Sequence, residues 1–242
     1  YDDMVKRSIG VIKINGSANV TAQGGAGAAG ISCSRFYITA GAKRENFILC
    51  DSKGVIRKGR TDLTPEKAEF AVETEARTLK TMAPGPVIFA MANPVPEIFP
   101  DVALAAGAAV VGTGRSDFPN QINNVLGFPG IFRGALDVRA KDINEAMKLA
   151  ASQALAELAA EPVPAGVKKV LAEAYPADAA AGMFDSKGGV NVNCVIPKPF
   201  DPRVVPRVAR RVAEAAMKSG VAQLDIGDLD AYEKSVAERL GK

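Results

Sequence analysis

The segment GGAGAAG, residues 24–30, contains only small side chains and opens the run ISCSRFYITA, whose spacing is helical. Within it, Gly25-x-Gly27-x-x-Gly30 matches the fingerprint of a loop that leads from a strand into a helix and binds a dinucleotide. The first glycine permits a tight turn, the second lets a pyrophosphate approach the backbone, and the third lets the helix pack closely on the sheet. The helix N-terminus supplies N–H groups and the positive end of the helix dipole. Alone, the pattern also fits a small-residue helix that packs tightly.

An acidic residue at the expected distance favours the dinucleotide interpretation. Asp51 ends the apolar run NFILC and lies 21 residues after Gly30, where a carboxylate accepts hydrogen bonds from an adenosine ribose. An acid at this position favours NAD, whereas Lys53, Arg57 and Lys58 leave NADP open. The predicted cofactor-binding residues are Gly25, Ala26, Gly27, Ala28, Gly30, Asp51 and Ser52.

The residues in front of the glycines fit this motif poorly. NGSANVTAQ, residues 15–23, has the composition of a weak strand. The better run, VIKI, ends eleven residues before Gly25.

Alternating apolar patterns predict the fold class. β-Branched runs predict strands and helical spacing predicts helices between them, which implies a parallel sheet. The expected strands cover residues 9–14, 46–50, 86–91 and 108–112, and the expected helices cover 28–40, 65–81, 100–107, 142–160, 203–219 and 228–240. Residues 162–202 are interrupted by proline and glycine and are predicted to be irregular. We therefore expect an α/β, Rossmann-like, doubly wound and mostly parallel sheet with helices on both faces and added C-terminal helices.

Domain boundaries follow from the same patterns. Residues 1–23 are expected to be a remnant or linker from a preceding domain, and residues 24–160 the NAD(P)-binding domain. Residues 161–242 are expected to form an irregular segment and C-terminal helices that pack on it. Asp142 and Glu145 resemble a capping box at the start of the long helix.

Composition excludes several classes of site and partner. The 242 residues are 48% hydrophobic and carry a net charge of +3, which is too weak to suggest a nucleic-acid partner. No apolar run is long enough to span a membrane, and the N-terminus does not read as a signal peptide. Three cysteines without metal-ligand spacing predict reduced, mostly buried thiols in a cytoplasmic protein. The absence of histidine excludes Ser-His and Cys-His nucleophile pairs.

Asparagines follow two of the predicted strands. Asn93 comes just after the run VIFAM, and GTGRSDFPNQINN, residues 112–124, follows the next strand. Ligands bind beyond the carboxyl ends of parallel strands, and side-chain amides suit carboxylates, hydroxyls and carboxamides. Asn93, Asn123 and Asn124 are the predicted substrate-binding residues. For Asn120, a purely structural role in capping or turning the chain is equally open.

Several segments of the chain resemble those of a known family. The segments GAGAAG, CDSKGVIRKGRTDLTPEK, FAMANPVPEI, GTGRSDFPNQINNVLGFPGIFRGALDVRA, INEAMKLAA and IPKPFDPRVVP are similar to the nucleotide-binding domain of malic enzymes, particularly the shorter bacterial type. The resemblance implies oxidation of L-malate with NAD or NADP and decarboxylation to pyruvate and CO₂ with Mg²⁺ or Mn²⁺. It further implies that Asn93 and Asn124 hold the carboxylates of malate, with Asn123 close by. We also expect a homodimer.

The chain departs from the family pattern in its first residues. The family's catalytic tyrosine and lysine and most of its metal ligands belong to an N-terminal domain, so the catalytic residues stay unassigned here. The start YDDM resembles the family's metal segment, which makes Asp3 a weak metal-ligand candidate. Three hypotheses remain open: a malic-enzyme chain carrying mainly the dinucleotide-binding part, an inactive dinucleotide-binding module, or another Rossmann dehydrogenase.

Overall fold

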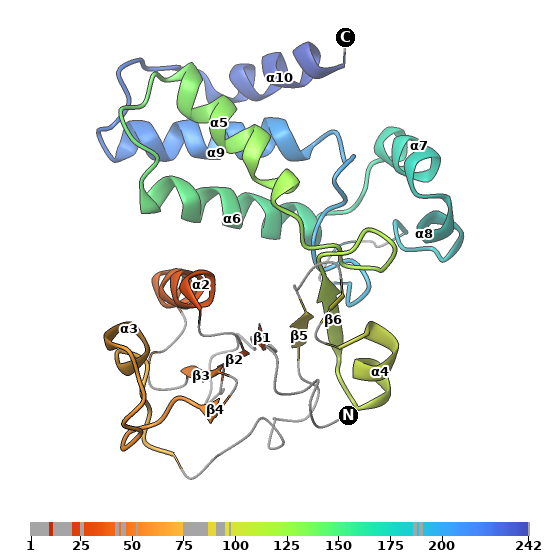
Figure 1. The fold of residues 1–242 in the computed structure, drawn as a ribbon. Coiled ribbons are helices and arrows are strands. Elements are labelled where there is room, and N and C mark those ends of the chain that lie inside the picture. The colour runs from red at the N-terminus through yellow and green to blue at the C-terminus, as the bar shows by residue number, and fades with distance from the viewer. Residues whose placement is uncertain are drawn as a thin grey trace. The chain divides into compact units, whose positions relative to one another are not determined.

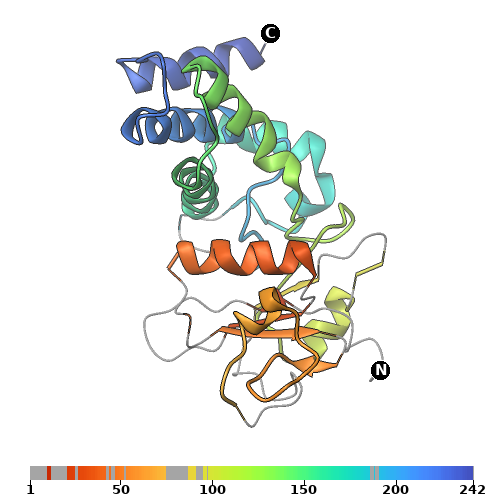
Figure 2. The same cartoon turned by 60° about the vertical axis from the view of Figure 1, so that its left-hand side comes forward.

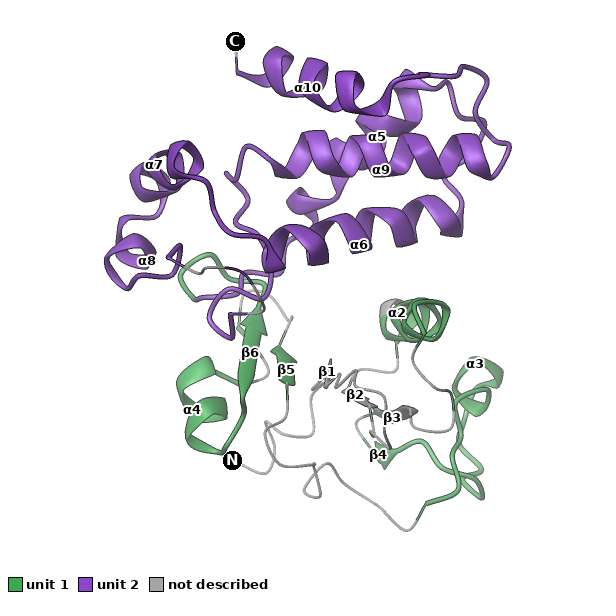
Figure 3. Cartoon of the chain, turned by 180° about the vertical axis from the view of Figure 1, so that it is seen from behind, with its two compact units in different colours: residues 1–118 green, residues 119–242 purple. Residues whose placement is uncertain are grey.

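The computed structural model describes residues 10–11, 21–24, 27–41, 44, 47–51, 53–74, 87–90, 95–96, 98–185, 188 and 191–241. The chain forms two compact units, residues 1–118 and residues 119–242, shown in different colours in Figure 3. The domain boundaries expected from the sequence, at residues 24 and 161, stay predictions.

The first unit is built on a six-stranded sheet with the order β4-β3-β2-β1-β5-β6 (Figure 1). Two pairs are parallel, β2 with β3 and β5 with β6, while β1 pairs antiparallel with both β2 and β5. Because β1 is antiparallel to both of its neighbours, β2 and β5 run in the same direction, and the four parallel strands end at one edge of the sheet. The strands are β1 (Gly10–Val11), β2 (Thr21–Gly24), β3 (Phe47–Asp51), β4 (Gly54–Val55), β5 (Val87–Ala90) and β6 (Val110–Thr113).

The described residues of the first unit include the helices α2 (Ala28–Thr39), α3 (Pro65–Ala68) and α4 (Pro100–Ala105). In Figure 2, α2 lies alongside the strands β2 and β3. The α/β class and the Rossmann-like alternation expected from the sequence are confirmed. Two short strands are antiparallel additions, β1 in the middle of the sheet and β4 at its edge beside β3.

The helix predicted for residues 65–81 is wrong for residues 69–74, because α3 ends at Ala68. Thr64 caps α3 by accepting a hydrogen bond from the Lys67 N–H, but the helix ends after a single turn. Phe70 is fully buried with Ile31, Leu49 and Ile56. Since a fully buried aromatic side chain contributes about 1.5–3 kcal/mol by leaving water, this packing outweighs the propensity to continue the helix. Residues 75–81 lie outside the described residues.

The second unit is helical. It comprises α5 (Phe128–Asp137), α6 (Glu145–Ala160), α7 (Ala165–Ala174), α8 (Pro176–Ala180), α9 (Val204–Lys218), α10 (Leu229–Leu240) and the 3₁₀ turn η2 (Asn124–Leu126). The helices α7 and α8 fall where the sequence predicted irregular chain, so that prediction is wrong for these residues. The predicted capping box is also wrong, because Asn144, not Asp142, caps α6 by accepting a hydrogen bond from the Met147 N–H.

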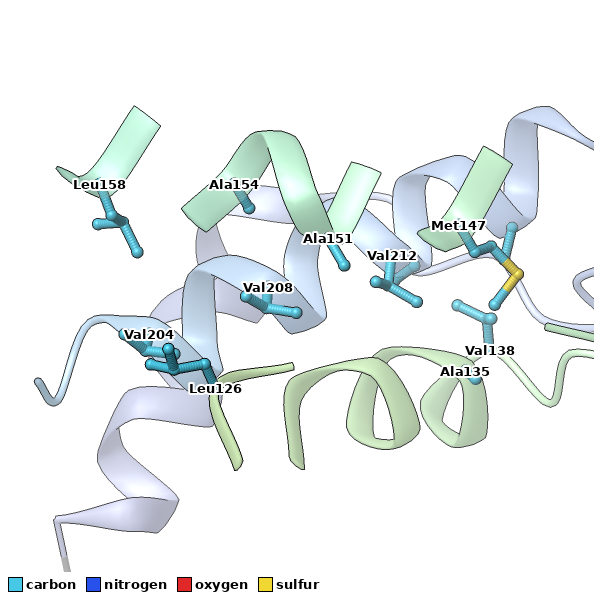
Figure 4. Packing of buried hydrophobic residues seen from close by; sticks show 12 residues of the cluster. Leu126, Ala135, Val138, Met147, Ala151, Ala154, Leu158, Val204, Val208 and Val212 are labelled. Carbon is cyan, nitrogen blue, oxygen red and sulfur yellow. The ribbon is translucent and has the colours of Figure 1, made fainter. Parts of the chain in front are cut away.

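One apolar core joins α5, α6 and α9. Figure 4 shows Met147 of α6 and Val138, at the end of α5, pointing toward each other beside Val212 of α9. The fully or almost fully buried members are Leu126, Ala135, Val138, Met147, Ala151, Ala154, Leu158, Val204, Val208, Val212, Ala213 and Ala216. On α6, the buried members of this core are Met147, Ala151, Ala154 and Leu158.

Two glycines let α5 approach α9 closely. A Cβ added to Gly134 would lie 2.4 Å from the carbonyl oxygen of Ala209, and one added to Gly130 would lie 2.6 Å from Cβ of Val208. Both distances are far inside van der Waals contact. The crossing of α5 and α9 therefore depends on having no side chain at either position.

Arginines on α9 form ion pairs with carboxylates of the neighbouring helices. Arg207 donates to Glu161, just after α6, and to Glu233 of α10, each at 2.8 Å. Arg210 pairs with Asp230 of α10, and Arg211 pairs with Glu157 of α6. The solvent side of α9 is thereby tied to α6 and α10, although exposed pairs of this kind each contribute only about 0–1 kcal/mol.

Two further expectations can be checked on the described residues. No helix among them is both long enough and apolar enough to cross a membrane. Cys33 and Cys194 are free thiols and half-buried.

Candidate dinucleotide site

The glycine loop directly links a strand to a helix. β2 ends at Gly24 and α2 begins at Ala28, with Gly27 as its N-cap. The sequence Thr21–Gly24 does form a strand, so the weak strand signal in front of the glycines was misleading. Its backbone pairs in parallel with β3 over its full length, and this pairing compensates for the low strand propensity of Ala22 and Gly24.

Gly27 leaves open space at the start of α2. Its backbone is extended, with φ −83° and ψ −177°, and Gly27, as the N-cap, has no side chain of its own with which to cap the helix. A Cβ added to Gly27 would meet none of the described atoms within 4 Å. Neither backbone strain nor packing within the described part of the chain therefore requires glycine at this position. An uncapped helix N-terminus with open space in front of it fits a phosphate group.

The next two members of the motif lie on α2 itself. Ala28 is exposed in the first turn. Gly30 is buried, and the hydroxyl of Ser34 donates to its carbonyl oxygen at 2.7 Å. The third glycine is thus on the packed side of α2, as the fingerprint requires.

Asp51 lies at the same edge of the sheet as the glycine loop. Gly24 pairs with Cys50 in the parallel ladder, so Asp51 is one residue beyond the end of β2 on the adjacent strand. Its side chain is only 9% exposed. The carboxylate accepts hydrogen bonds from Arg60 at 3.0 and 3.1 Å, from Lys67 Nζ at 2.9 Å and from the Lys53 N–H at 3.0 Å.

These partners keep Asp51 ionised. Burial raises the pKa of Asp51, but the hydrogen bonds from Arg60 and Lys67 outweigh burial and lower it overall. Arg60 also binds Asp62 at 2.8 Å, and Lys53 Nζ lies 2.9 Å from the same carboxylate. We call Asp51, Lys53, Arg60, Asp62 and Lys67 the Asp51 cluster; its three cations outnumber its two carboxylates, which leaves one net positive charge.

Sequence reasoning missed Arg60 and Lys67. Arg60 follows the short β4, and Lys67 lies in α3, so both reach Asp51 only after the chain has turned back twice. Of the cations that the sequence did suggest, Lys58 pairs with Glu73 at 3.3 Å and Arg57 donates to the Lys58 carbonyl. Arg60 and Lys67 follow Asp51 by 9 and 16 residues, so both are near it in the sequence. The sequence alone, however, does not predict the conformation of the chain between these residues, and their contact with Asp51 depends on that conformation.

The end of β6 supplies further charged groups at this edge. Arg115 makes a two-pronged ion pair with Asp117, at 2.8 and 2.7 Å, and its guanidinium lies 5.6 Å from the centre of the Phe118 ring. These residues follow β6, which is parallel to β5 and ends at the same edge.

The second unit brings Asn123 and Asn124 into one turn. Asn123 is the N-cap of η2, where its Oδ1 accepts from the Val125 N–H at 3.0 Å. Asn124 is exposed, and its side chain makes no hydrogen bond within the part of the chain that the structure describes. Asn124 is thus available to a ligand, whereas the carbonyl end of the Asn123 amide is already engaged.

Other predicted site residues lie outside the described residues: Asp3, Gly25, Ala26, Ser52 and Asn93. Among the residues that are described, no three His, Cys, Asp or Glu side chains are grouped closely enough to hold a metal ion.

Comparison with known proteins shows similarity to malic enzymes. A family model described as the NAD-binding domain of malic enzyme matches residues 72–173. The chain is 47% identical to an NADP-dependent malic enzyme of Rhizobium meliloti over 89% of its length, covering 30% of that protein. It is 47% identical to an NADP-dependent malic enzyme of Halomonas elongata over 82% of its length, covering 50% of that protein. An NAD-dependent malic enzyme of Rhizobium meliloti is 44% identical over 86% of this chain.

Solved structures agree with this assignment. The malic enzyme of Pyrococcus horikoshii superposes with a TM-score of 0.70 at 32% identity, over 93% of this chain and 53% of that one. The malic enzyme of Entamoeba histolytica gives a TM-score of 0.67 at 34% identity, over 89% of this chain and 46% of that one. The chain spans about half or less of the length of these relatives. Over most of its own length, the chain is therefore similar to malic enzymes, and residues 72–173 match the model of their NAD-binding domain.

Proposed function

We propose that this chain binds NAD or NADP at the carboxyl edge of its sheet and serves as the dinucleotide-binding part of an enzyme that converts L-malate to pyruvate and CO₂. The observation that carries the proposal is the helix start at Gly27, where an added Cβ would meet none of the described atoms within 4 Å, on the strand next to that of Asp51. The malic enzymes among its relatives support the choice of substrate.

In this proposal, the start of α2 and the Asp51 cluster bind different parts of the dinucleotide. The N-terminus of α2 binds the pyrophosphate through backbone N–H groups of its first turn, beginning at Gly27. The Asp51 cluster lies where the adenosine ribose binds in this type of fold. Since the charge of Asp51 is balanced by Arg60 and Lys67, this acid repels a 2′-phosphate less than an isolated carboxylate would.

The substrate side of the proposal rests on side-chain amides. Asn124, and Asn93 outside the described residues, donate to the carboxylates of malate, with Asn123 beside them. An amide adds no charge that would have to be desolvated. The dinucleotide, when bound, would supply the acceptor for the hydride from C2 of malate. A divalent cation, Mg²⁺ or Mn²⁺, is proposed by resemblance alone. The described residues offer no cation site, and Asp3, which lies outside them, stays the weak candidate ligand that the resemblance suggests.

Malate-dependent reduction of NAD or NADP tests the proposal. The full-length protein that carries this chain, supplied with malate and Mn²⁺, should generate reduced nicotinamide and pyruvate in equal amounts. Nucleotide binding without turnover would favour an inactive dinucleotide-binding module. Reduction with another 2-hydroxy acid but not with malate would favour a different Rossmann dehydrogenase. The homodimer expected from the sequence is a separate proposal, which sedimentation of the same protein would test.

A further inference from the structure

Asn120 has an uncommon backbone conformation in a buried position. Its φ is +55°, in the left-handed region, and the residue is only 3% exposed. Left-handed backbone is disfavoured for residues other than glycine, and asparagine tolerates it better than most. A buried polar residue in this conformation needs a structural or functional reason.

The Asn120 amide bridges two distant segments. Its Nδ2 donates to the carbonyl oxygen of Val192 at 2.9 Å, and its Oδ1 accepts from the N–H of Val195 at 2.9 Å. One side chain thus binds a donor and an acceptor of a backbone segment that follows more than seventy residues later in the chain. This two-point attachment fixes the orientation of the Asn120 backbone as well as its position.

The segment that Asn120 holds is itself anchored. We call residues 191–201 the strap. The Cys194 N–H donates to the Asn191 carbonyl at 2.8 Å, and the Asn191 side chain donates to the carbonyl of Met183, which is buried after α8. Farther along, the buried Lys198 pairs with Asp178 of α8 at 2.6 Å. The strap is therefore fixed to α8 and the turn after it.

On its other side, Asn120 lies three residues before the turn that carries Asn123 and Asn124. The far end of this turn is held by Leu126, which is 2% exposed in the core of the second unit. Between Asn120 and Leu126, the exposed Asn124 side chain is presented from a turn that is fixed at both ends.

We propose that Asn120 is a positioning residue, which ties the Asn123–Asn124 turn to the strap and so holds the Asn124 amide where it binds a carboxylate of malate. The malate part of this inference rests on the proposed function. Few side chains can replace Asn120: aspartate lacks the donor for Val192, and glycine accepts the backbone conformation but has no amide.

The first test measures how firmly the Asn123–Asn124 turn is held and needs no substrate. Asn120→Gly removes the amide without straining the left-handed backbone. Asn144→Ala serves as the matched control, because it removes another asparagine side chain in the same unit, the N-cap of α6. In the full-length protein, hydrogen–deuterium exchange of amides 123–127 should become about tenfold faster in Asn120→Gly and stay unchanged in Asn144→Ala. Unchanged exchange in Asn120→Gly would overturn the inference.

The second test concerns malate. In the active full-length enzyme, Asn120→Gly should raise the KM for malate roughly ten- to a hundredfold, since displacement of a binding group by about 1 Å has effects of this size. The KM for the dinucleotide should stay within about twofold, and Asn144→Ala should leave both KM values unchanged, although it lowers stability. Asn120→Asp, which keeps the acceptor for Val195, should lie between wild type and Asn120→Gly.

The outcomes separate the two proposals. If Asn120→Gly loosens the turn but leaves the KM for malate unchanged, Asn120 does not position the substrate, while the proposed function stands. If the wild-type protein turns over no malate at all, the proposed function and the malate part of this inference both fail, whereas the exchange experiment still decides whether Asn120 fixes the turn.

Discussion

A Cβ added at Gly27 and a Cβ added at Gly134 would meet opposite surroundings. At the start of α2, none of the described atoms lies within 4 Å of the added group. On α5, the same group would come within 2.4 Å of the backbone of α9. The first glycine leaves space that the described protein does not use, and the second lets two helices touch.

The comparison teaches how to tell a binding glycine from a packing glycine. Both occur as Gly-rich patterns with helical neighbours, GAGAAG before α2 and GIFRG within α5, so residue type does not distinguish them. The difference lies in what the missing side chain would displace: an external ligand in one case and the neighbouring helix in the other. Substitution should therefore affect binding at Gly27 and folding at Gly134.

The largest effect is expected for Gly134→Ala. One methyl group at this position forces the backbones of α5 and α9 apart, so the cost should reach about 3 kcal/mol, the upper end for overpacking a core. That corresponds to a fall in Tm of about 6–12 °C for a chain of this size, measured by calorimetry or circular dichroism. A variant as stable as the wild type would show that the crossing can widen freely, and the distinction drawn here would fail.

Gly27→Val should separate binding from folding. The extended backbone at this position accepts valine, so stability should change by no more than about 1 kcal/mol, the usual range for an N-cap substitution. Affinity for NAD and NADP should fall roughly a hundredfold, because the side chain displaces a phosphate from charged hydrogen bonds. Calorimetric titration measures this loss, and Ala40→Val at the other end of α2 is the control. Wild-type affinity in Gly27→Val would remove the glycine loop from the site.

Asp51→Asn tests which dinucleotide the binding site prefers. The sequence predicts a preference for NAD, and the structure adds that the Asp51 carboxylate balances Arg60 and Lys67. Removing one negative charge should shift the ratio of affinities toward NADP by about tenfold, since a unit charge near the surface is worth roughly 1–2 kcal/mol to a nearby phosphate. Asp117→Asn, at the end of β6 and paired with Arg115, is the matched control. An unchanged ratio would mean that the 2′-position is recognised elsewhere.

Gly166→Ala should give the smallest change, with the opposite sign. Gly166 lies in the first turn of α7, and a Cβ there would meet none of the described atoms within 4 Å. Alanine should therefore stabilise the protein by about 0.5–1 kcal/mol by restricting the unfolded chain and favouring the helix. A loss of stability on urea denaturation would show that α7 needs a glycine for a reason that neither packing nor binding explains.

Strongly periodic segments could be predicted from the sequence. The helix α9 was expected at 203–219 and spans Val204–Lys218, because its apolar residues recur every three or four positions while its arginines line the other side. The loop–helix junction at Gly27 and the place of Asp51 at the end of β3 were also predictable, since they depend on local spacing.

Features that depend on distant parts of the chain could not be predicted. Thr21–Gly24 becomes a strand only through its pairing with β3, and the helix after Pro65 stops because Phe70 is buried against Leu49 and Ile56. Arg60 and Lys67 reach Asp51 across two turns. The role of Asn120 was left open for the same reason, because its partners lie more than seventy residues away.

The position of β1 has a consequence for synthesis on the ribosome. This two-residue strand pairs with β2 on one side and with β5 on the other, and β5 follows only after β3, β4 and α3 have been made. The strands β1 to β4, with the glycine loop, are therefore translated before β5, and until then the edge of β1 that pairs with β5 has no partner. An unpaired strand edge is the surface through which nascent chains associate. We expect a chain arrested before Val87 to sediment as aggregates, whereas the chain released after β6 should remain in the supernatant.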